Sequence, residues 1–433
     1  MSPSTGKSTS NASVASDESC RFETIQISDT EEPEFYRKGG FHPVHIGEHF
    51  DGRRYRIAHK LGHGGFSVVW LAYDSLESIW VALKIVAAED SPMTEEKAVM
   101  CHNIISQMKD ERFITYKRFF RIEGPNGRHL CLVLPPCGPS CNTLSQYLQS
   151  RIHPWLARRV ASQATQAIAD LHAQGLYHGG ADAPRYIVGN LDFTSAEDLI
   201  LDDICLIDCD QAFLVSAPPK KTLGTPPGFL APEVAVGKPA SPAGDVWALG
   251  CTILQIRSGS SPFSIPNVDS PANLLGWVSE YIGRMPTSWG KPVFDDDGQP
   301  TTDTANGEHL GEMLENTRSL RQWISEIWDQ PENLEELQPT STAPDRVKDE
   351  NKPYLKCYSN KFWKPTAFRI DDVYLGAYSD KVDKIIESLP KISTQEVELL
   401  YDLISKNFVY EPAQRVSARD ILAHPWFHID DTT

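Results

Sequence analysis

The sequence predicts an α+β protein built of two unequal parts, a small antiparallel β-rich part followed by a larger, mainly helical part. Runs of β-branched and aromatic residues follow one another between Tyr55 and Leu134 with turn residues between them, which is the pattern of strands joined by short turns. Beyond Pro136 the apolar residues recur at steps of three and four, the period of a helix. The change of period near residues 135–139 marks the junction of the two parts.

Three apolar runs predict the strands. The first is Val68 to Leu71 and the second is Trp80 to Val86, with a turn around Asp74 between them. The third, His129 to Leu134, follows the strong turn signal Gly124 to Gly127 and ends at two prolines. These runs supply the sheet of the smaller part.

Three other patterns predict helices of the larger part. Apolar residues between Leu156 and Leu171 lie on one helical face. Residues 246–256 are apolar nearly all round, so we expect a helix buried inside this part. A third amphipathic pattern runs from Val397 to Ile404, and a further helix is expected around Trp323 and Trp328.

Composition narrows the classes of function. The chain has 433 residues, 40% of them hydrophobic, enough for a sizeable core. Its formal charge of −17 argues against direct nucleic-acid binding, which needs a basic face, and favours basic protein partners, although many soluble proteins are acidic. The nine cysteines form no C-x-x-C pair, and no apolar run reaches eighteen residues. We therefore expect a protein of the cytoplasm and/or nucleus that has no membrane-spanning segment and no zinc site.

A glycine-rich segment, Leu61 to Val69, lies between two predicted strands. Glycines there let backbone N–H groups approach phosphates closely, because no Cβ intervenes, although a plain hairpin turn has the same composition. The third glycine of the pattern G-x-G-x-x-G is replaced by Ser67. Lys84, at the end of the next strand, favours phosphate binding, because such a lysine holds nucleotide phosphates once an acidic residue positions it.

Two acidic positions are predicted to complete this site. Glu96 is the expected partner of Lys84, because Val99 and Met100 follow it at the spacing of a helix face packed on the sheet, and Glu95 is the alternative. Asp208 ends an apolar strand that begins at Ile204. A carboxylate at a strand end that faces bound phosphates is a good Mg²⁺ ligand, although a turn aspartate fits the same pattern.

Further motifs follow in a fixed order. A-P-E ends at Glu233, D-V-W-A-L-G begins at Asp245, and P-A-Q-R ends at Arg415. With the glycine-rich segment, V-A-L-K and D-x-x, this ordered set resembles the eukaryotic protein kinases. Residues Lys38 to Gly47 and Phe66 to Trp70 look like the SR-protein kinases, which phosphorylate serines in Arg/Ser-rich proteins.

The resemblance implies a bilobal protein kinase fold with an antiparallel β-rich N-lobe and a mainly helical C-lobe. The segment before the kinase-like domain is Ser/Thr-rich and almost free of large apolar side chains, so we predict that it is disordered. The insertion in the C-lobe either packs its own tryptophans or supplies a docking surface. The expected boundaries are a tail at 1–32, a kinase-like domain at 33–428 with lobes of about 50–136 and about 137–428 and an insertion at about 285–390, and a tail at 429–433.

ATP and Mg²⁺ are the cofactors that the resemblance implies. Lys84 and Asp208 would be catalytic, with Asp208 also the metal ligand. Glu233 and Arg415 would form a buried structural ion pair, and Asp245 would also be structural. The ATP-binding residues would be Leu61, Gly62, Gly64, Gly65, Phe66, Ser67, Val69, Ala82, Lys84, Glu96, Leu134, Pro136, Cys137, Ile187 and Ile207.

The catalytic loop departs from the family pattern. Kinases of this kind place after H-R or H-G an Asp that accepts the substrate hydroxyl proton, and five residues later an Asn that holds a second Mg²⁺. Here Gly180 follows His178-Gly179, and Arg185 stands at the Asn position. In one interpretation Asp182 is a substitute base. In the other, transfer is weak or absent, because glycine has no acceptor and a guanidinium repels the cation.

Between Asp208 and Glu233 the threonines are Thr222 and Thr225. The resemblance places Thr225 where these kinases contact the substrate, although Pro226-Pro227 fits a structural turn equally well. Two classes of function therefore remain. An enzyme would require ATP and Mg²⁺, whereas a non-catalytic scaffold would hold a basic or Arg/Ser-rich partner without either.

Overall fold

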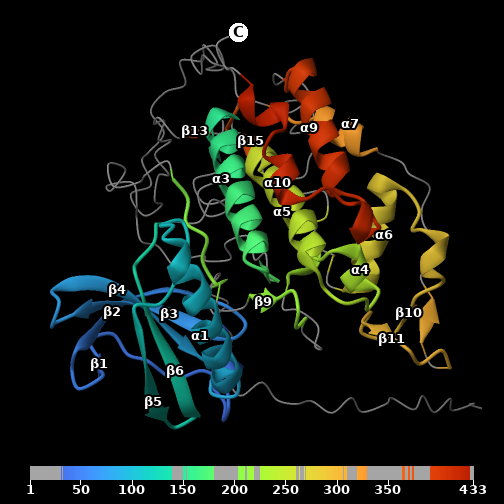
Figure 1. Cartoon of the computed structure of the whole chain (residues 1–433). Helices are drawn as coiled ribbons and strands as arrows, with labels where there is room; N and C mark the ends of the chain where they lie inside the picture. Colours follow the sequence, from blue (N-terminus) through green and yellow to red (C-terminus); the bar gives the residue numbers. More distant parts are fainter. Residues whose placement is uncertain are drawn as a thin grey trace, which may run out of the picture.

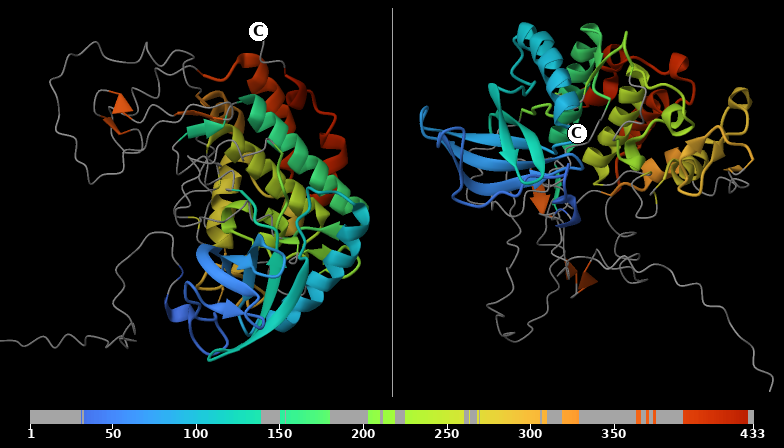
Figure 2. Two further views of the ribbon diagram at one scale, coloured as in Figure 1. Left: turned by 90° about the vertical axis from the view of Figure 1, so that its left-hand side faces the viewer. Right: turned by 90° about the horizontal axis from the view of Figure 1, so that it is seen from below.

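The computed structural model separates a β-sheet lobe from a helical lobe in all three views (Figures 1 and 2). The smaller lobe contains the sheet and one long helix, and the larger lobe contains the remaining long helices. This is the predicted α+β, bilobal arrangement. The structure describes residues 31, 33–138, 150–152, 154–179, 203–209, 212–218, 225–259, 263, 268, 270–305, 307–309, 319–328, 363–365, 369–370, 373–374 and 391–429.

The N-lobe sheet has six strands in the order β1-β2-β3-β4-β6-β5, and every neighbouring pair is antiparallel. The three predicted runs lie in β3, β4 and β6, and the predicted turn Gly124 to Gly127 closes the β5–β6 hairpin. Strand β5 was not predicted. The strands are β1 (His49–Phe50), β2 (Tyr55–His63), β3 (Ser67–Asp74), β4 (Ile79–Val86), β5 (Arg118–Gly124) and β6 (Gly127–Leu134).

Strand β4 lies in the middle of this sheet. Residues 81–86 of β4 are all buried, so both faces of this strand are covered. Helix α1 (Ser91–Met108) lies against the sheet (Figure 1) and packs on β6. Pro92 near its start suits the first turn of a helix, where the missing N–H would have had no helical partner. The sheet's opposite face packs on an apolar cluster that includes Phe41 and Tyr55.

The N-terminal segment before β2 also carries a buried histidine. His42 packs on His129 of β6, with 5.0 Å between ring centroids, and both residues are buried. Burial and the neighbouring His129 lower the pKa of His42 to about 4, and the charge of Glu48 acts in the opposite direction. Desolvation likewise lowers the pKa of His129. Both rings are therefore neutral at neutral pH.

The C-lobe confirms the three predicted long helices. Helix α3 (Pro154–Ala173) contains the 156–171 pattern, α5 (Pro242–Ser258) contains 246–256, and α9 (Thr394–Asn407) contains 397–404. Apolar side chains of all three helices belong to one buried cluster in the C-lobe. The other helices described are α4 (Pro232–Ala235), α6 (Pro271–Ile282), α7 (Leu320–Ser325), α10 (Ala418–Ile421), and the 3-10 turns η1 (Pro33–Phe35), η5 (Pro227–Phe229), η6 (Thr287–Trp289), η8 (Pro412–Gln414) and η9 (Pro425–His428).

Helix α5 is the centre of the C-lobe, as its apolar composition predicts. Trp247 is fully buried between Phe263 and Phe408, with ring centroids 5.6 and 4.6 Å away. The helix ends at Ser258 and is capped by Gly259, whose φ of 77° is the left-handed conformation that favours glycine. The short strands of this lobe are β7 (Ser150–Ile152), β8 (Leu176–Tyr177), β9 (Phe213–Leu214), β10 (Val293–Phe294), β11 (Pro300–Thr301), β12 (Glu308–His309), β13 (Trp363–Pro365), β14 (Arg369–Ile370) and β15 (Val373–Tyr374).

The described part of the predicted insertion packs on the C-lobe core. Helix α7 contains Trp323 as predicted but ends before Trp328, which forms an isolated bridge with Lys391. Trp289 packs on Tyr410 with 5.7 Å between ring centroids, and its Nε1 donates to Glu411 at 2.7 Å. No helix in the described ranges is both long and apolar enough to cross a membrane.

Candidate functional site

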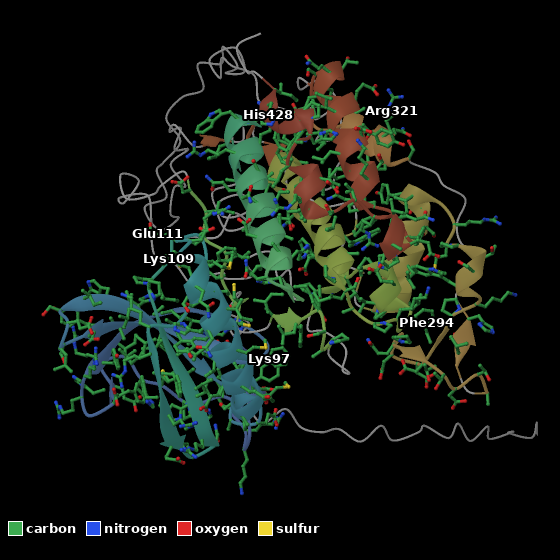
Figure 3. All side chains as sticks on the ribbon, in the orientation of Figure 1. Lys97, Lys109, Glu111, Phe294, Arg321 and His428 are labelled. Carbon is green, nitrogen blue, oxygen red and sulfur yellow. The ribbon has the colours of Figure 1, made fainter. Side chains whose placement is uncertain are left out.

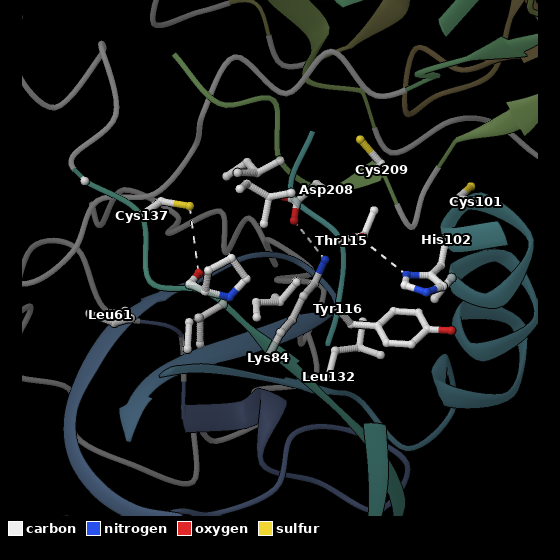
Figure 4. Close-up of a pocket in the computed structure, with 18 residues that line it drawn as sticks. Leu61, Lys84, Cys101, His102, Thr115, Tyr116, Leu132, Cys137, Asp208 and Cys209 are labelled. Carbon is white, nitrogen blue, oxygen red and sulfur yellow. Dashed lines mark hydrogen bonds and ion pairs between the residues drawn. The ribbon is translucent and has the colours of Figure 1, made fainter. Parts of the chain in front are cut away.

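A cavity of about 120 Å³ lies where the two lobes meet (Figure 4). Strands β2, β3, β4 and β6 form one wall, helix α1 forms the rear, and the segment ending at Cys209 forms the opposite wall. The residues that line it are Leu61, Val69, Ala82, Lys84, Ala98, Cys101, His102, Ile114, Thr115, Tyr116, Leu132, Leu134, Pro135, Cys137, Gly138, Ile207, Asp208 and Cys209.

One end of the cavity is an apolar slot, and it contains most of the predicted adenine contacts. Six predicted residues line it, from the sheet, the linker and the opposite wall. Pro136 does not line it, whereas its neighbours Pro135 and Cys137 do. The predicted residues that line the slot are Leu61, Val69, Ala82, Leu134, Cys137 and Ile207.

Residues 135–138, which form the linker between the lobes, present few backbone N–H groups to the cavity. Prolines have no N–H, so residues 135 and 136 present only carbonyls, and the next N–H belongs to Cys137. Burial, with Cys205 and Asp208 nearby, raises the pKa of the Cys137 thiol to about 11. The thiol is therefore protonated at neutral pH, and its Sγ lies 3.9 Å from the Pro135 carbonyl oxygen.

The glycine-rich segment forms the turn between β2 and β3. The Gly64 N–H donates to the Ser67 carbonyl at 2.8 Å, and Phe66 is 50% exposed. Gly62, Gly64, Gly65, Phe66 and Ser67 are not among the residues that line the cavity. A Cβ at Gly65 would meet no atom within 4 Å, so packing does not require glycine there. Contact of this turn with phosphates remains a prediction.

Lys84 and Asp208 meet inside the cavity. Lys84 Nζ lies 2.9 Å from Asp208 Oδ1, and their side chains are 6% and 20% exposed. Figure 4 shows the pair between the linker side and the α1 side of the cavity. Asp208 has a φ of 61°, a conformation that non-glycine residues seldom adopt and that is concentrated at functional sites.

The predicted pairing of Lys84 with Glu96 is wrong. Glu96 is exposed on α1 and does not line the cavity. The predicted face was misjudged, because Val99 is 36% exposed while Ala98 and Cys101 are turned inward. Glu95, the alternative, instead forms an ion pair with Arg121 of β5.

The rear of the cavity was missed by the sequence analysis. His102 Nδ1 lies 3.3 Å from Thr115 Oγ1, and the His102 ring stacks on Tyr116 with 4.5 Å between centroids. Figure 4 shows these side chains on the far side of Lys84 from Cys137. The signal available in the sequence was weak, because an isolated histidine on a helix is more often a packing residue.

The chain leading to the catalytic loop is anchored to α5. The backbone N–H groups of His178 and Gly179 donate to the Asp245 carboxylate at 2.6 and 3.0 Å, and His172 Nε2 lies 3.0 Å from it. This supports the predicted structural role of Asp245. Thr225 Oγ1 donates to the Gly179 carbonyl at 3.1 Å. Of the predicted positions, Gly180, Asp182, Arg185, Ile187 and Thr222 lie outside the described residues.

Glu233 and Arg415 form the predicted buried ion pair. Both Arg415 Nη atoms donate to the Glu233 carboxylate at 2.9 Å, and the two side chains are 1% and 0% exposed. Arg415 also donates to the Val409 carbonyl. This pair joins the short helix α4 to the end of the chain, which is a structural role.

Among the described residues, the wall of the cavity offers one carboxylate for a cation. Asp208 is the acidic residue among those that line it, and no group of three metal-ligating side chains occurs within the described ranges. Across the lobe boundary, Lys97 of α1 places its Nζ 3.9 Å from the centre of the Phe213 ring of β9 (Figure 3). The described residues thus fit a nucleotide better than they fit a complete metal site.

A comparison with models of protein families shows which class of protein this chain belongs to. The protein kinase domain model matches residues 55–427. The chain belongs to the protein kinase family. The match includes both walls of the cavity, so Lys84 and Asp208 lie inside the kinase domain.

The relatives that this kinase domain resembles include kinases of the SRPK type. Protein kinase dsk1 of Schizosaccharomyces pombe is 36% identical over 158 residues, 34% of this chain and 29% of the relative. Human SRSF protein kinase 3 is 41% identical over 114 residues, 25% of this chain and 20% of the relative. The serine/threonine-protein kinase SRPK of Physarum polycephalum is 26% identical over 317 residues, 60% of this chain and 74% of the relative. The matches thus span less than a third of the first two relatives.

Proposed function

We propose that this chain binds ATP in the cavity between the lobes, and that phosphoryl transfer to Ser or Thr of basic, Arg/Ser-rich proteins is weak or absent. The observation that carries the nucleotide site is the meeting of Lys84 and Asp208 at the end of an apolar slot. A flat apolar slot next to a buried cation suits a base attached to a phosphate chain.

The described residues define how the nucleotide would be held. Leu61, Val69 and Ala82 would cover one face of the adenine, and Ile207 would lie beneath it. The Cys137 N–H and the Pro135 carbonyl would provide its polar contacts at the linker. Lys84 would bind the phosphates as a cation. ATP supplies the phosphoryl group when it is bound, and the chain orients it.

The proposal of weak transfer depends on the catalytic loop sequence. Gly180 has no side chain to accept the substrate proton, and the guanidinium of Arg185 repels a second cation. General-base assistance contributes roughly 10²- to 10⁴-fold to rates. Loss of the base and of one metal ligand would therefore lower activity by several orders of magnitude, which makes the chain a pseudokinase.

The expected partner follows from charge and from the relatives. The net charge of −17 favours a basic protein, and similar proteins bear the names SRSF protein kinase and SRPK. In a pseudokinase the same partner would be held rather than modified. Binding of an Arg/Ser-repeat peptide in the absence of ATP and Mg²⁺, together with no phosphate transfer when both are present, would distinguish this scaffold from an enzyme.

The test combines binding and turnover. Calorimetry with ATP and with adenosine should show binding of both to the wild type, and Lys84→Met should weaken ATP while leaving adenosine unchanged. Mass spectrometry of an Arg/Ser-repeat peptide incubated with protein, ATP and Mg²⁺ should show little phosphate transfer. Robust transfer that Asp182→Asn abolishes would instead establish an active kinase with Asp182 as its base, and failure to bind ATP and adenosine would refute the nucleotide site.

A further inference from the structure

Ten residues that precede the matched kinase domain pack as part of the N-lobe. The domain match begins at residue 55, yet residues 33–42 contain Phe41, which is 2% exposed and belongs to the apolar cluster of the sheet. Phe35 and Tyr36 pack on the Phe41 ring, with 5.5 and 5.9 Å between centroids. We call residues 33–42 the N-terminal brace.

The N-terminal brace is hydrogen-bonded to the junction between β4 and α1. The Ala88 N–H donates to the Gly40 carbonyl at 3.1 Å. The Glu89 N–H donates to the Gly39 carbonyl at 2.8 Å. Arg37 adds an exposed ion pair with Glu89. Helix α1 begins two residues after Glu89, so these bonds connect the start of the helix to a segment outside the domain match.

The N-terminal brace is also bonded to the turn between β5 and β6. The Gly39 N–H donates to the Asn126 carbonyl at 2.8 Å, and Asn126 Nδ2 donates to the Phe41 carbonyl at 2.6 Å. His42 packs on His129 of β6. Figure 1 shows the start of α1 and the β5–β6 turn at the same end of the N-lobe. The brace therefore connects the start of α1 to the β5–β6 hairpin.

Helix α1 forms the rear wall of the cavity, so its position affects the site. Ala98, Cys101 and His102 of α1 line the cavity, and the brace is not among the described residues that line it. The brace thus contacts the junction that leads into the wall helix without contacting the cavity.

We propose that the N-terminal brace is a control point for α1. While the brace is in place, it holds the start of the helix to the β5–β6 hairpin, and its displacement allows α1 and the rear wall of the cavity to open. The inference goes beyond the proposed function, because the brace lies outside the cavity and outside the domain match. A change outside the kinase domain can thereby alter the wall of the site.

The hydrogen bonds of the brace set the size of the effect. One hydrogen bond within a protein shifts an equilibrium by about two- to tenfold, because water replaces it when it breaks. Two backbone bonds hold the residues just before α1. We therefore expect displacement of the brace to increase the population with an open α1 about tenfold.

The experiment is amide hydrogen exchange of the full chain without ligand, which reports locally opened states. Gly40→Ala displaces the brace, because a Cβ there would overlap the Phe35 carbonyl oxygen. Exchange of α1 should become about tenfold faster, while exchange of α5 stays unchanged. The matched control is Gly276→Ala, because a Cβ there would meet no atom within 4 Å; it should leave the exchange of α1 unchanged. No change in α1, or an equal change in α5, overturns the proposal.

Asn126→Asp tests the brace from the side of the sheet and keeps the proposal testable if Gly40→Ala folds poorly. Aspartate has no amide donor for the Phe41 carbonyl, so exchange of α1 should rise as it does in Gly40→Ala. Both substitutions act through the same segment, so the double variant should exchange little faster than either single variant. Additive effects would mean that Asn126 acts within its own turn, and would overturn the proposal.

A second readout follows the cavity wall. Cys101 of α1 is 1% exposed and lines the cavity, and Cys251 of α5 is 0% exposed in the C-lobe core. In Gly40→Ala, alkylation of Cys101 by iodoacetamide, measured by mass spectrometry, should be about tenfold faster and that of Cys251 unchanged. Faster exchange of α1 without faster alkylation of Cys101 overturns the link to the cavity. Neither measurement uses a nucleotide, so a failure of the proposed nucleotide site leaves the test of the brace intact.

Discussion

An ion pair inside the C-lobe and an ion pair between the lobes have different surroundings. Glu233 and Arg415 of the C-lobe are 1% and 0% exposed, and backbone carbonyls accept further hydrogen bonds from Arg415. Lys84 and Asp208 are 6% and 20% exposed, and both line a cavity. The first pair is enclosed by protein, and the second faces space that a ligand can occupy.

The difference shows how surroundings assign a role to a pair. A pair that is fully desolvated and fully hydrogen-bonded cannot exchange partners without leaving a buried charge, which costs several kcal/mol. A pair at a cavity wall can exchange one member for a ligand of the same charge. We therefore expect the C-lobe pair to govern stability and the Lys84–Asp208 pair to govern binding.

The largest effect is expected at Glu233. Glu233→Ala leaves the Arg415 guanidinium buried without its carboxylate, so the free energy of unfolding should fall by about 3–5 kcal/mol. Urea denaturation followed by tryptophan fluorescence measures it. The control is Glu398→Ala, whose carboxylate is 50% exposed in a surface pair with Arg321 and should change stability by less than about 1 kcal/mol. Equal effects would remove the distinction between the two kinds of pair.

The next effect concerns a buried ionisable ring rather than an ion pair. The pKa of His42 is lowered from 6.5 to about 4, so the unfolded chain takes up a proton more readily than the folded one. Above pH 6.5 His42 is neutral in both the folded and the unfolded chain, and its contribution to the free energy of unfolding is fully present. As the pH falls toward 4 that free energy decreases by about 3 kcal/mol. His42→Phe should show a smaller fall in melting temperature between pH 7 and 4.5. Parallel falls would exclude His42 as the source.

The packing around the C-lobe pair is tested at Gly250 of α5. A Cβ there would lie 2.8 Å from Phe408 Cε1 and 2.9 Å from Asn407 Cβ, so Gly250→Ala should destabilise by about 1–3 kcal/mol. A Cβ at Gly276 of α6 would meet no atom within 4 Å. Gly276→Ala should therefore stabilise by about 0.5–1 kcal/mol. A stabilising Gly250→Ala would mean that the α5–α9 contact is looser than the structure shows.

The smallest effect on stability is expected at the cavity. Lys84→Met leaves Asp208 partly exposed to water, so the free energy of unfolding should change by about 1 kcal/mol or less. The same urea denaturation provides the comparison with Glu233→Ala. A loss as large as that of Glu233→Ala would show that Lys84 is structural, contrary to the assignment made from its place in the cavity wall.

Local sequence patterns were sufficient to predict several strands and helices and the protein family. The strands β3, β4 and β6 and the helices α3, α5 and α9 lie where the apolar periodicity predicted them, because side-chain period follows backbone geometry. The order of motifs from Lys84 to Arg415 indicated a kinase fold, and the domain match over residues 55–427 agrees. The pairing of Glu233 with Arg415, 182 residues apart, was available only through that resemblance.

Only the tertiary structure decided which side chains enter the cavity. Glu96 and Pro136 were predicted to line it, and both point elsewhere. For Glu96 the reason is that successive helix residues point about 100° apart, so an error of one position changes the face that a side chain occupies. The sequence alone predicted that Lys84 and Asp208 belong to one site. The meeting of the two lobes brings them into contact, because Lys84 lies on β4 and Asp208 lies on the opposite wall of the cavity.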